Sequence, residues 1–268
     1  MSESTSAPLR SSAGARSGAR MRSPVRNEYT TTLWVLSVIL LGAFPLCSYA
    51  VFGLGADRTQ TSAVLSCIYV AVMTSLFAAP WLPFPSLRGE SSYRRLERMV
   101  YIWIIVYTLT VLLWQIPWIL LHERIAAAGD ELWAYTWWAY IDGGDMRYVE
   151  PNWLVFFIEG GADINGILGA IALLIWFRSR KTNVLPVYYF MFAAALHIYP
   201  TLLYYTSEVA RGFPNVDTES FINLYVKFVC SNAFWVILPF FVLVWGKQTL
   251  ERIYRDRYSP AGASPSKG

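Results

Sequence analysis

Charged residues are scarce in this chain, and most of them lie outside its long apolar stretches. Lys, Arg, Asp and Glu make up 15% of the 268 residues, whereas apolar residues make up 55%. The apolar residues come in runs of about 20 or more, which is the length that crosses ~30 Å of hydrocarbon. This distribution excludes an ordinary water-soluble domain. It predicts an all-α, polytopic membrane protein with about six transmembrane helices.

Cysteine and histidine are scarce as well, with three and two residues. Cys47, Cys67 and Cys230 all fall inside apolar runs, and an odd number of such thiols gives neither a disulfide framework nor a metal-binding spacing. The chain carries no metal, phosphate or nucleotide motif. The net charge of +4 does not indicate nucleic acid, because the basic residues sit in tails and short loops. We therefore expect no metal, no cofactor and no nucleic-acid partner.

The distribution of basic residues predicts the orientation of six spans. With the N-terminus inside, 17 Lys and Arg residues fall on the cytoplasmic side and four on the opposite side. Cytoplasmic loops carry such an excess of Lys and Arg, so both termini are predicted to be cytoplasmic. The predicted spans are 31–53, 61–84, 99–121, 152–177, 185–207 and 221–245.

Residues 1–26 are rich in Arg and Ser and contain one acidic residue, Glu3. This composition predicts a disordered basic tail. An organellar transit peptide has a similar composition and is the alternative.

The fourth span carries two acids, Glu159 and Asp163, which share one face of a helix because they are four residues apart. Charged groups at bilayer depth are costly, and they face a bundle interior, a cavity or a partner. A structural ion pair with Lys227 or His197 is the alternative to a catalytic role. The same span contains glycines that we expect to allow close helix approach: Gly160, Gly161, Gly166 and Gly169.

Two further spans carry polar faces. In the sixth span, Asn232 and Trp235 are three residues apart and share a face. The fifth span carries one helical stripe at i, i+4, i+7 and i+11: His197, Thr201, Tyr204 and Glu208. Together the three spans predict a cavity lined with carboxyl, imidazole, amide and indole groups, which suits chemistry on an apolar substrate.

The segment 122–151 is the longest predicted external loop and is rich in aromatic residues. We favour an aromatic belt at the level of the lipid headgroups, with a lid over a lipid-entry cavity as the alternative. The residues concerned are Trp133, Tyr135, Trp137, Trp138 and Tyr140.

Three separate segments resemble a known family. They are Gly144–Tyr148 followed by Glu159, His197–Glu208 followed by Arg211–Phe213, and Ser231–Pro239. In this order and spacing, residues 98–246 resemble the emopamil-binding protein family of sterol isomerases, known as the EXPERA domain. The resemblance divides the chain into a tail (1–26), two spans with a basic loop (27–97), an EXPERA-like four-helix domain (98–246) and a basic cytoplasmic tail (247–268).

The resemblance implies a reaction in which a sterol ring double bond moves from the delta-8 to the delta-7 position. Protonation of the alkene gives a tertiary carbocation, and loss of a proton on the other side gives the product. Glu159 matches the family's catalytic glutamate, and Asn232 and Trp235 match its asparagine and cation-facing tryptophan. We expect a membrane-dissolved sterol or terpenoid substrate, residence in the endoplasmic reticulum and a possible homodimer. The expected substrate-binding residues are Asp145, Tyr148, Tyr204, Glu208, Trp114 and Gln115.

The chain also departs from the family. The family has His and Glu four residues apart on the span before the aromatic loop, whereas the segment Val111–Trp118 contains neither. Conversely, Asp163 and His197 are ionisable where the family has neutral residues. We therefore predict that Asp163 or His197 assists Glu159.

Three functions remain open from the sequence. The favoured function is a sterol double-bond isomerase. A terpenoid cyclase or rearrangement enzyme would use the same cation chemistry on another substrate, and a lipid-sorting protein would bind sterols or cationic amphiphiles without converting them.

Overall fold

The computed structural model describes residues 27–258, so the predicted tail 1–26 and residues 259–268 lie outside the description. Within the described part, the chain is helical and contains no strand. Six helices are long and apolar enough to cross a membrane, which confirms the predicted all-α fold and the number of spans. The spans are Glu28–Leu54, Arg58–Trp81, Ser92–Ala127, Trp153–Arg178, Val184–Val209 and Ile222–Tyr258.

The third and sixth spans are longer than the sequence indicated. The third was expected at 99–121 and runs from Ser92 to Ala127, and the sixth continues to Tyr258. Residues 247–258, which we assigned to a tail, are therefore the end of a helix. These residues include several charged side chains, so an interpretation based on apolar runs did not predict that the helix continues.

Five of the six spans begin where a short polar side chain caps the helix. Asn152, for example, accepts hydrogen bonds from the backbone N–H groups of Leu154 and Val155. Such caps satisfy backbone donors that have no partner within the helix. The equivalent caps are Asn27 before α1 (Glu28–Leu54), Asp57 before α2 (Arg58–Ala78), Ser91 before α3 (Ser92–Thr110), Asn152 before α6 (Trp153–Arg178) and Asn183 before α7 (Val184–Val209).

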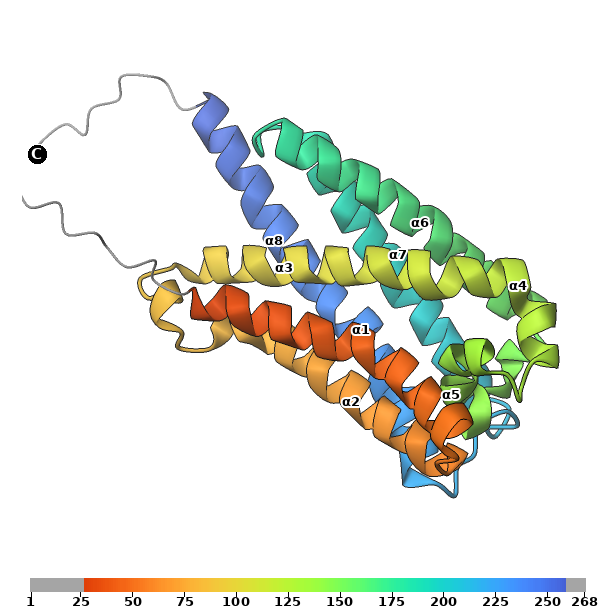
Figure 1. Cartoon of the computed structure of the whole chain (residues 1–268). Helices are drawn as coiled ribbons and strands as arrows, with labels where there is room; N and C mark the ends of the chain where they lie inside the picture. The colour runs from red at the N-terminus through yellow and green to blue at the C-terminus, as the bar shows by residue number, and fades with distance from the viewer. Residues whose placement is uncertain (1–26, 259–268) are drawn as a thin grey trace, which may run out of the picture.

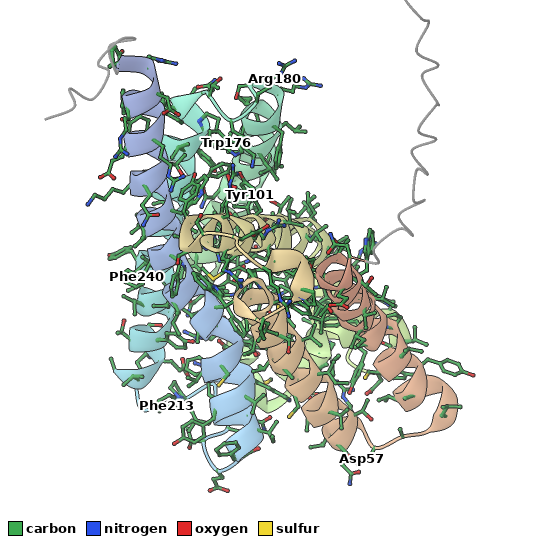
Figure 2. All side chains as sticks on the ribbon, turned by 90° about the vertical axis from the view of Figure 1, so that its left-hand side faces the viewer. Asp57, Tyr101, Trp176, Arg180, Phe213 and Phe240 are labelled. Atoms are coloured by element: carbon green, nitrogen blue, oxygen red, sulfur yellow. The ribbon has the colours of Figure 1, made fainter. Side chains whose placement is uncertain are left out.

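The helices form two groups joined by α3. α1 packs on α2, whereas α7 packs on α6 and on α8 (Ser231–Tyr258), and α3 contacts both α6 and α8. Figure 1 shows α3 running between the α1–α2 pair and the other group. In Figure 2, Arg180 lies at one end of the bundle, and Asp57 and Phe213 lie at the other. We call these the Arg180 end and the Asp57 end; the predicted orientation would make the first cytoplasmic.

A π-helical turn interrupts the third span, and a nine-residue π-helix begins the sixth span. In η3 (Val111–Gln115), the Ile116 N–H donates to the Val111 carbonyl five residues earlier. Pro117 follows at once and has no N–H to continue the α-helical pattern. η6 (Ile222–Cys230) ends in the same way, with the Ser231 N–H bonded to Val226. Such bulges are frequent at functional sites because they turn side chains out of the regular helical register.

The aromatic segment packs under the bundle instead of forming a belt. After α4 (Ile116–Ala127) the chain forms η4 (Leu132–Ala134), α5 (Tyr135–Gly144) and η5 (Met146–Tyr148). Tyr135 and Trp137 are buried. The Trp137 indole donates to the Trp114 carbonyl at 3.0 Å, and Trp138 donates to Ile125 at 2.7 Å. The favoured belt interpretation is therefore wrong for Tyr135 and Trp137, whereas Trp133 is exposed.

Only one of the four glycines in the fourth span makes a close helix contact. A Cβ atom on Gly166 would come within 2.6 Å of the Val111 side chain, so this glycine lets α6 approach η3. A Cβ atom on Gly160 or Gly161 would have no neighbour within 4 Å. The close-approach prediction was wrong for these two, because the chain leaves open space beside them.

Candidate active site in a cavity lined by all six spans

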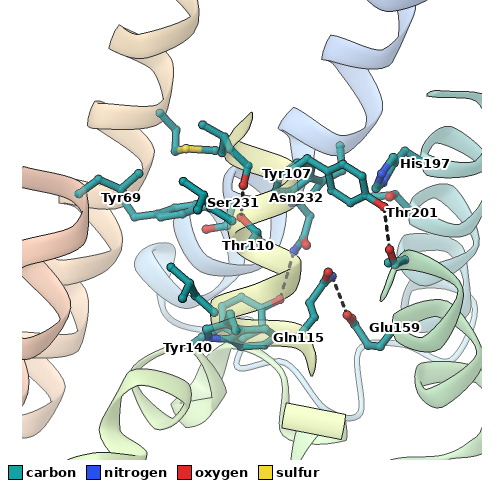
Figure 3. A pocket seen from close by; sticks show the side chains of 18 of the residues that line it. Tyr69, Tyr107, Thr110, Gln115, Tyr140, Glu159, His197, Thr201, Ser231 and Asn232 are labelled. Carbon is teal, nitrogen blue, oxygen red and sulfur yellow. Dashed lines mark hydrogen bonds between the residues drawn. The ribbon is translucent and has the colours of Figure 1, made fainter. Parts of the chain in front are cut away.

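A cavity of about 730 Å³ lies between the two helix groups and is lined by residues from every span. This volume is typical of small-molecule pockets, which are mostly apolar with a few placed polar groups. Figure 3 shows such polar groups converging from different helices. The cavity separates a buried cluster around Trp103, Trp176 and Trp245 from a second cluster around Trp118 and Tyr148.

The cavity opens along the flank of the bundle. Several residues that line it are also exposed, including Leu41 on α1, Ile105 and Leu109 on α3, and Leu113 on η3. All four are apolar and lie within membrane spans, where an exposed side chain faces lipid. The cavity lining therefore reaches the apolar flank of the bundle at α1 and the third span, and we call this stretch the lateral portal.

Glu159 is buried at the edge of this cavity and is held by two donors. The Gln115 Nε2 group donates to one carboxyl oxygen at 2.7 Å, and the Tyr148 hydroxyl donates to the other. Burial raises the pKa of Tyr148 well above its ordinary value, so this phenol stays a neutral donor. The two contacts fix the carboxyl of Glu159 in one orientation from two separate elements, η3 and η5.

The amide of Gln115 has an unused group. Its Oε1 atom is buried and has no hydrogen-bond partner within residues 27–258. Rotation of the amide by half a turn would exchange its N–H₂ and its oxygen. In the present orientation Gln115 donates to a carboxylate, and in the rotated one it would accept from a protonated Glu159. The side chain thus suits both protonation states of the acid.

A chain of hydrogen bonds leads from Asn232 out of the cavity. The Tyr204 hydroxyl donates to Asp145, so the Tyr140 hydroxyl, 2.8 Å from it, donates to the Tyr204 oxygen. Tyr140 in turn accepts from the Asn232 Nδ2 group at 3.1 Å. Burial raises the pKa of Tyr140 far above its ordinary value, so it remains protonated. The direction of each bond in this chain is therefore fixed.

The far end of that chain is a buried ion network outside the cavity. Arg147 binds Asp145 at 2.6 Å and lies 3.5 Å from Glu208, and all three residues are buried. Burial alone lowers the pKa of Arg147, but the hydrogen bonds and charge of Asp145 outweigh it and raise the pKa above the ordinary value. Because Asp145 and Glu208 do not line the cavity, their role in this geometry is to hold Tyr204 and the neighbouring loop.

His197 lies in a cage of aromatic rings. Its ring centroid is 4.2 Å from that of Tyr107, 5.2 Å from Trp103 and 5.9 Å from Trp235, which stacks on it. The Nε2 atom is buried and has no partner in the described part of the chain. His197, Tyr107 and Trp235 also line the cavity, so an imidazole ring and a π-surface meet at one wall.

Asp163 and Lys227 lie away from this wall. Asp163 is not among the lining residues, and its Oδ1 atom has no partner within residues 27–258. Lys227 donates to the Asp142 carbonyl at 2.7 Å. Neither Glu159 nor Asp163 forms an ion pair within the described residues, so the alternative of a structural pair with Lys227 or His197 is not formed.

The structure thus brings together most of the predicted site residues. The lining includes Glu159, His197, Asn232, Trp235, Tyr148, Tyr204, Trp114 and Gln115, whereas Asp163, Asp145 and Glu208 lie outside it. The polar lining residues that sequence analysis missed include Tyr69, Tyr107 and Thr110. Tyr107 and Thr110 are three apart on the third span, a spacing that places them on one face.

Comparison with known proteins agrees with the resemblance noted in the sequence. The chain is 26% identical over 124 residues to a 3-beta-hydroxysteroid-Delta(8),Delta(7)-isomerase of Cavia porcellus. The aligned part makes up 46% of this chain and 52% of the relative, so the similarity spans about half of the relative's length. No family model matches the chain, and no solved structure matches it. The similarity supports a relationship to sterol isomerases at a general level.

Proposed function

We propose that the protein is an integral membrane isomerase that moves a ring double bond in a sterol or a sterol-like polycyclic lipid. The observation that carries the proposal is the buried Glu159 carboxyl, oriented by Tyr148 and Gln115 at the edge of a large apolar cavity. The similarity to a sterol isomerase supports the substrate class.

In the first step, protonated Glu159 transfers its proton to one carbon of the double bond. The π electrons form the new C–H bond, and the adjacent carbon becomes a carbocation. The carboxylate left behind accepts the hydrogen bonds of Tyr148 and Gln115. Positioned proton transfer of this kind contributes about 100- to 10,000-fold to a rate.

The cation is stabilised by the aromatic wall. Trp235 and Tyr107 line the cavity with their ring centroids 6.2 Å apart. A cation over an aromatic face gains ~2 kcal/mol or more when water is excluded. An apolar cavity that opens to lipid also keeps away the water that would otherwise trap the cation.

In the second step, a proton leaves the carbon on the far side of the cation. The electrons of that C–H bond form the new double bond. We assign this proton to His197, because its ring lines the cavity beside Trp235 and its Nε2 atom has no hydrogen-bond partner within residues 27–258. The lipid gains one proton and loses one, so no co-reactant is needed, and the proton on His197 returns to Glu159 before the next turnover.

The proposal is tested by conversion of cholest-8-en-3β-ol in D₂O by the purified protein in lipid nanodiscs. The expected product is the delta-7 isomer with one deuterium, and its mass and position of the double bond identify it. Glu159→Gln should lower the rate by at least about 100-fold. Glu150→Gln is the matched control, because Glu150 is exposed and outside the cavity.

Two results would count against the proposal. Full conversion by a folded Glu159→Gln variant would show that Glu159 is not the acid of the reaction. If the wild-type protein binds the sterol without converting it, the protein is a lipid-sorting protein. In that case it would also fail to complement an isomerase-deficient strain.

A further inference from the structure

The first two spans precede the region that resembles the sterol isomerases, yet they form one wall of the cavity. From this wall we propose that the Tyr69 hydroxyl is a second anchor, which hydrogen-bonds a hydroxyl or carbonyl group on the lipid. This inference rests on the proposed function for the identity of the lipid as a polycyclic substrate. It makes Tyr69 a residue that determines specificity, at a distance from the reacting carbon atoms.

A stripe of hydroxyl groups on α2 leads into the cavity. Ser62, Ser66 and Tyr69 lie at i, i+4 and i+7, so they share one face of the helix. Ser62 Oγ donates to the Ala139 carbonyl at 2.7 Å and attaches α2 to α5. Ser66 Oγ donates to the Ser62 carbonyl at 2.8 Å, within the same helix. These two hydroxyl groups therefore have structural partners.

Tyr69, the third member of the stripe, has none. It lines the cavity and makes no side-chain hydrogen bond to any residue within 27–258. Its ring packs against the buried cluster that contains Met73, which holds the side chain in place. A polar group in apolar surroundings is costly without a partner. A polar group on a bound lipid would supply that partner.

The neighbouring hydroxyl groups define what Tyr69 recognises. Thr110 Oγ1 donates to the Val106 carbonyl at 3.0 Å, and Ser231 Oγ donates to Val226 at 2.9 Å. Both protons are used within the helices, so these oxygens can only accept. Tyr69, by contrast, has a free O–H to donate. A ligand hydroxyl can accept from Tyr69 and donate to Thr110 or Ser231, which a purely apolar lipid cannot do.

The position of Tyr69 relative to Glu159 fits an elongated ligand. In Figure 3, Tyr69 projects from α2 on one side of the cavity and Glu159 projects from α6 on the other, with Thr110 and Ser231 between them. A rigid polycyclic lipid with its oxygen at Tyr69 would present a distant ring to Glu159. The anchor would thus select which double bond meets the acid.

The experiment pairs removal of the hydroxyl from the protein with its removal from the ligand. Binding of cholest-8-en-3β-ol and of its 3-deoxy counterpart, cholest-8-ene, is measured in nanodiscs by displacement of tritiated cholest-8-en-3β-ol. We expect Tyr69→Phe to weaken binding of the hydroxylated sterol by about ten-fold and to leave the affinity for the deoxy compound unchanged. Tyr188→Phe is the matched control, because Tyr188 is exposed on α7 and its hydroxyl lies next to Tyr254.

Each outcome separates the anchor from the proposed reaction. Equal affinity of Tyr69→Phe and wild type for the hydroxylated sterol would overturn the anchor, even if the sterol is still isomerised. Equal weakening of both ligands would also overturn it, since the loss would then not depend on the ligand hydroxyl. The ten-fold selective loss without any isomerisation would support the anchor and refute the isomerase. Failure of wild type to bind either compound would refute both.

Discussion

The Tyr148 hydroxyl donates a hydrogen bond to Glu159 from a 3₁₀ turn that lies outside the membrane spans. The backbone of Tyr148 is fixed in turn, because its carbonyl accepts from the Trp118 indole at 3.1 Å. The orientation of a carboxyl inside the bundle therefore depends on a loop at the Asp57 end.

Replacement of Tyr148 by Phe is expected to lower kcat for sterol isomerisation by about 10- to 100-fold, the value of a hydrogen bond to a charged group. The ring should stay in place, because its centroid lies 4.9 Å from Trp118 and 5.3 Å from Trp114. Steady-state kinetics in nanodiscs measures the effect. Tyr135→Phe is the control from the same segment, since its hydroxyl bonds the Arg58 carbonyl. An unchanged kcat in Tyr148→Phe would show that Glu159 does not need this donor.

Replacement of His197 by Phe tests the second proton transfer. We expect kcat to fall by about 100-fold while the dissociation constant of the sterol changes little, because Phe keeps the aromatic packing with Tyr107 and Trp235. Asp163→Asn should have a much smaller effect, because Asp163 does not line the cavity. The reverse ranking of the two variants would assign the second step to Asp163.

Replacement of Asp145 by Asn should destabilise the protein by about 3–5 kcal/mol, since it leaves the Arg147 charge buried without its closest partner. Denaturation in detergent measures this loss. Asp130→Asn is the matched control, because Asp130 pairs with Arg58 on the surface and such pairs contribute about 0–1 kcal/mol. Equal stability of the two variants would mean that the buried network does not hold the loop.

Replacement of Gly166 by Ala should cost about 1–3 kcal/mol, because the new methyl group would press on Val111 in η3. Gly160→Ala, in the same helix, should cost nothing, since its Cβ would meet no atom within 4 Å. Thermal unfolding of the pair measures the difference. If Gly160→Ala is the more damaging variant, the packing of α6 against η3 is not the constraint.

Much of the fold could be predicted from the sequence, because apolar runs of bilayer length indicate the membrane spans. Glu159, Asn232 and Trp235 were found because they stand out within apolar spans and because the family resemblance implies roles for them. Asp163 was harder to place. The α6 residues that line the cavity are Phe157, Ile158, Glu159, Gly161, Ala162 and Asn165. Asp163 is not among them, although it lies on the same side of the helix as Glu159, so a shared helix face did not predict which acid reaches the cavity.

The role of Tyr69 and the contact between Gln115 and Glu159 could not be predicted in the same way. The importance of Tyr69 lies in the absence of a partner, and partners come from helices far away in the sequence. Gln115 contacts Glu159 across 44 residues, from a π-helical turn that shifts the register of the span. Periodicity along one helix contains no information on either relationship.

The lateral portal has a consequence for how this protein meets its lipid. The rim residues Leu41, Leu109 and Leu113 face the acyl chains, so a lipid would arrive by diffusion within the membrane plane. The occupancy of the cavity then depends on the mole fraction of that lipid in the membrane. It does not depend directly on the concentration of the lipid in the surrounding buffer. Inert phospholipid added to a fixed amount of substrate would lower the mole fraction of the substrate in the membrane. The occupancy of the cavity would then fall, although the total amount of substrate is unchanged.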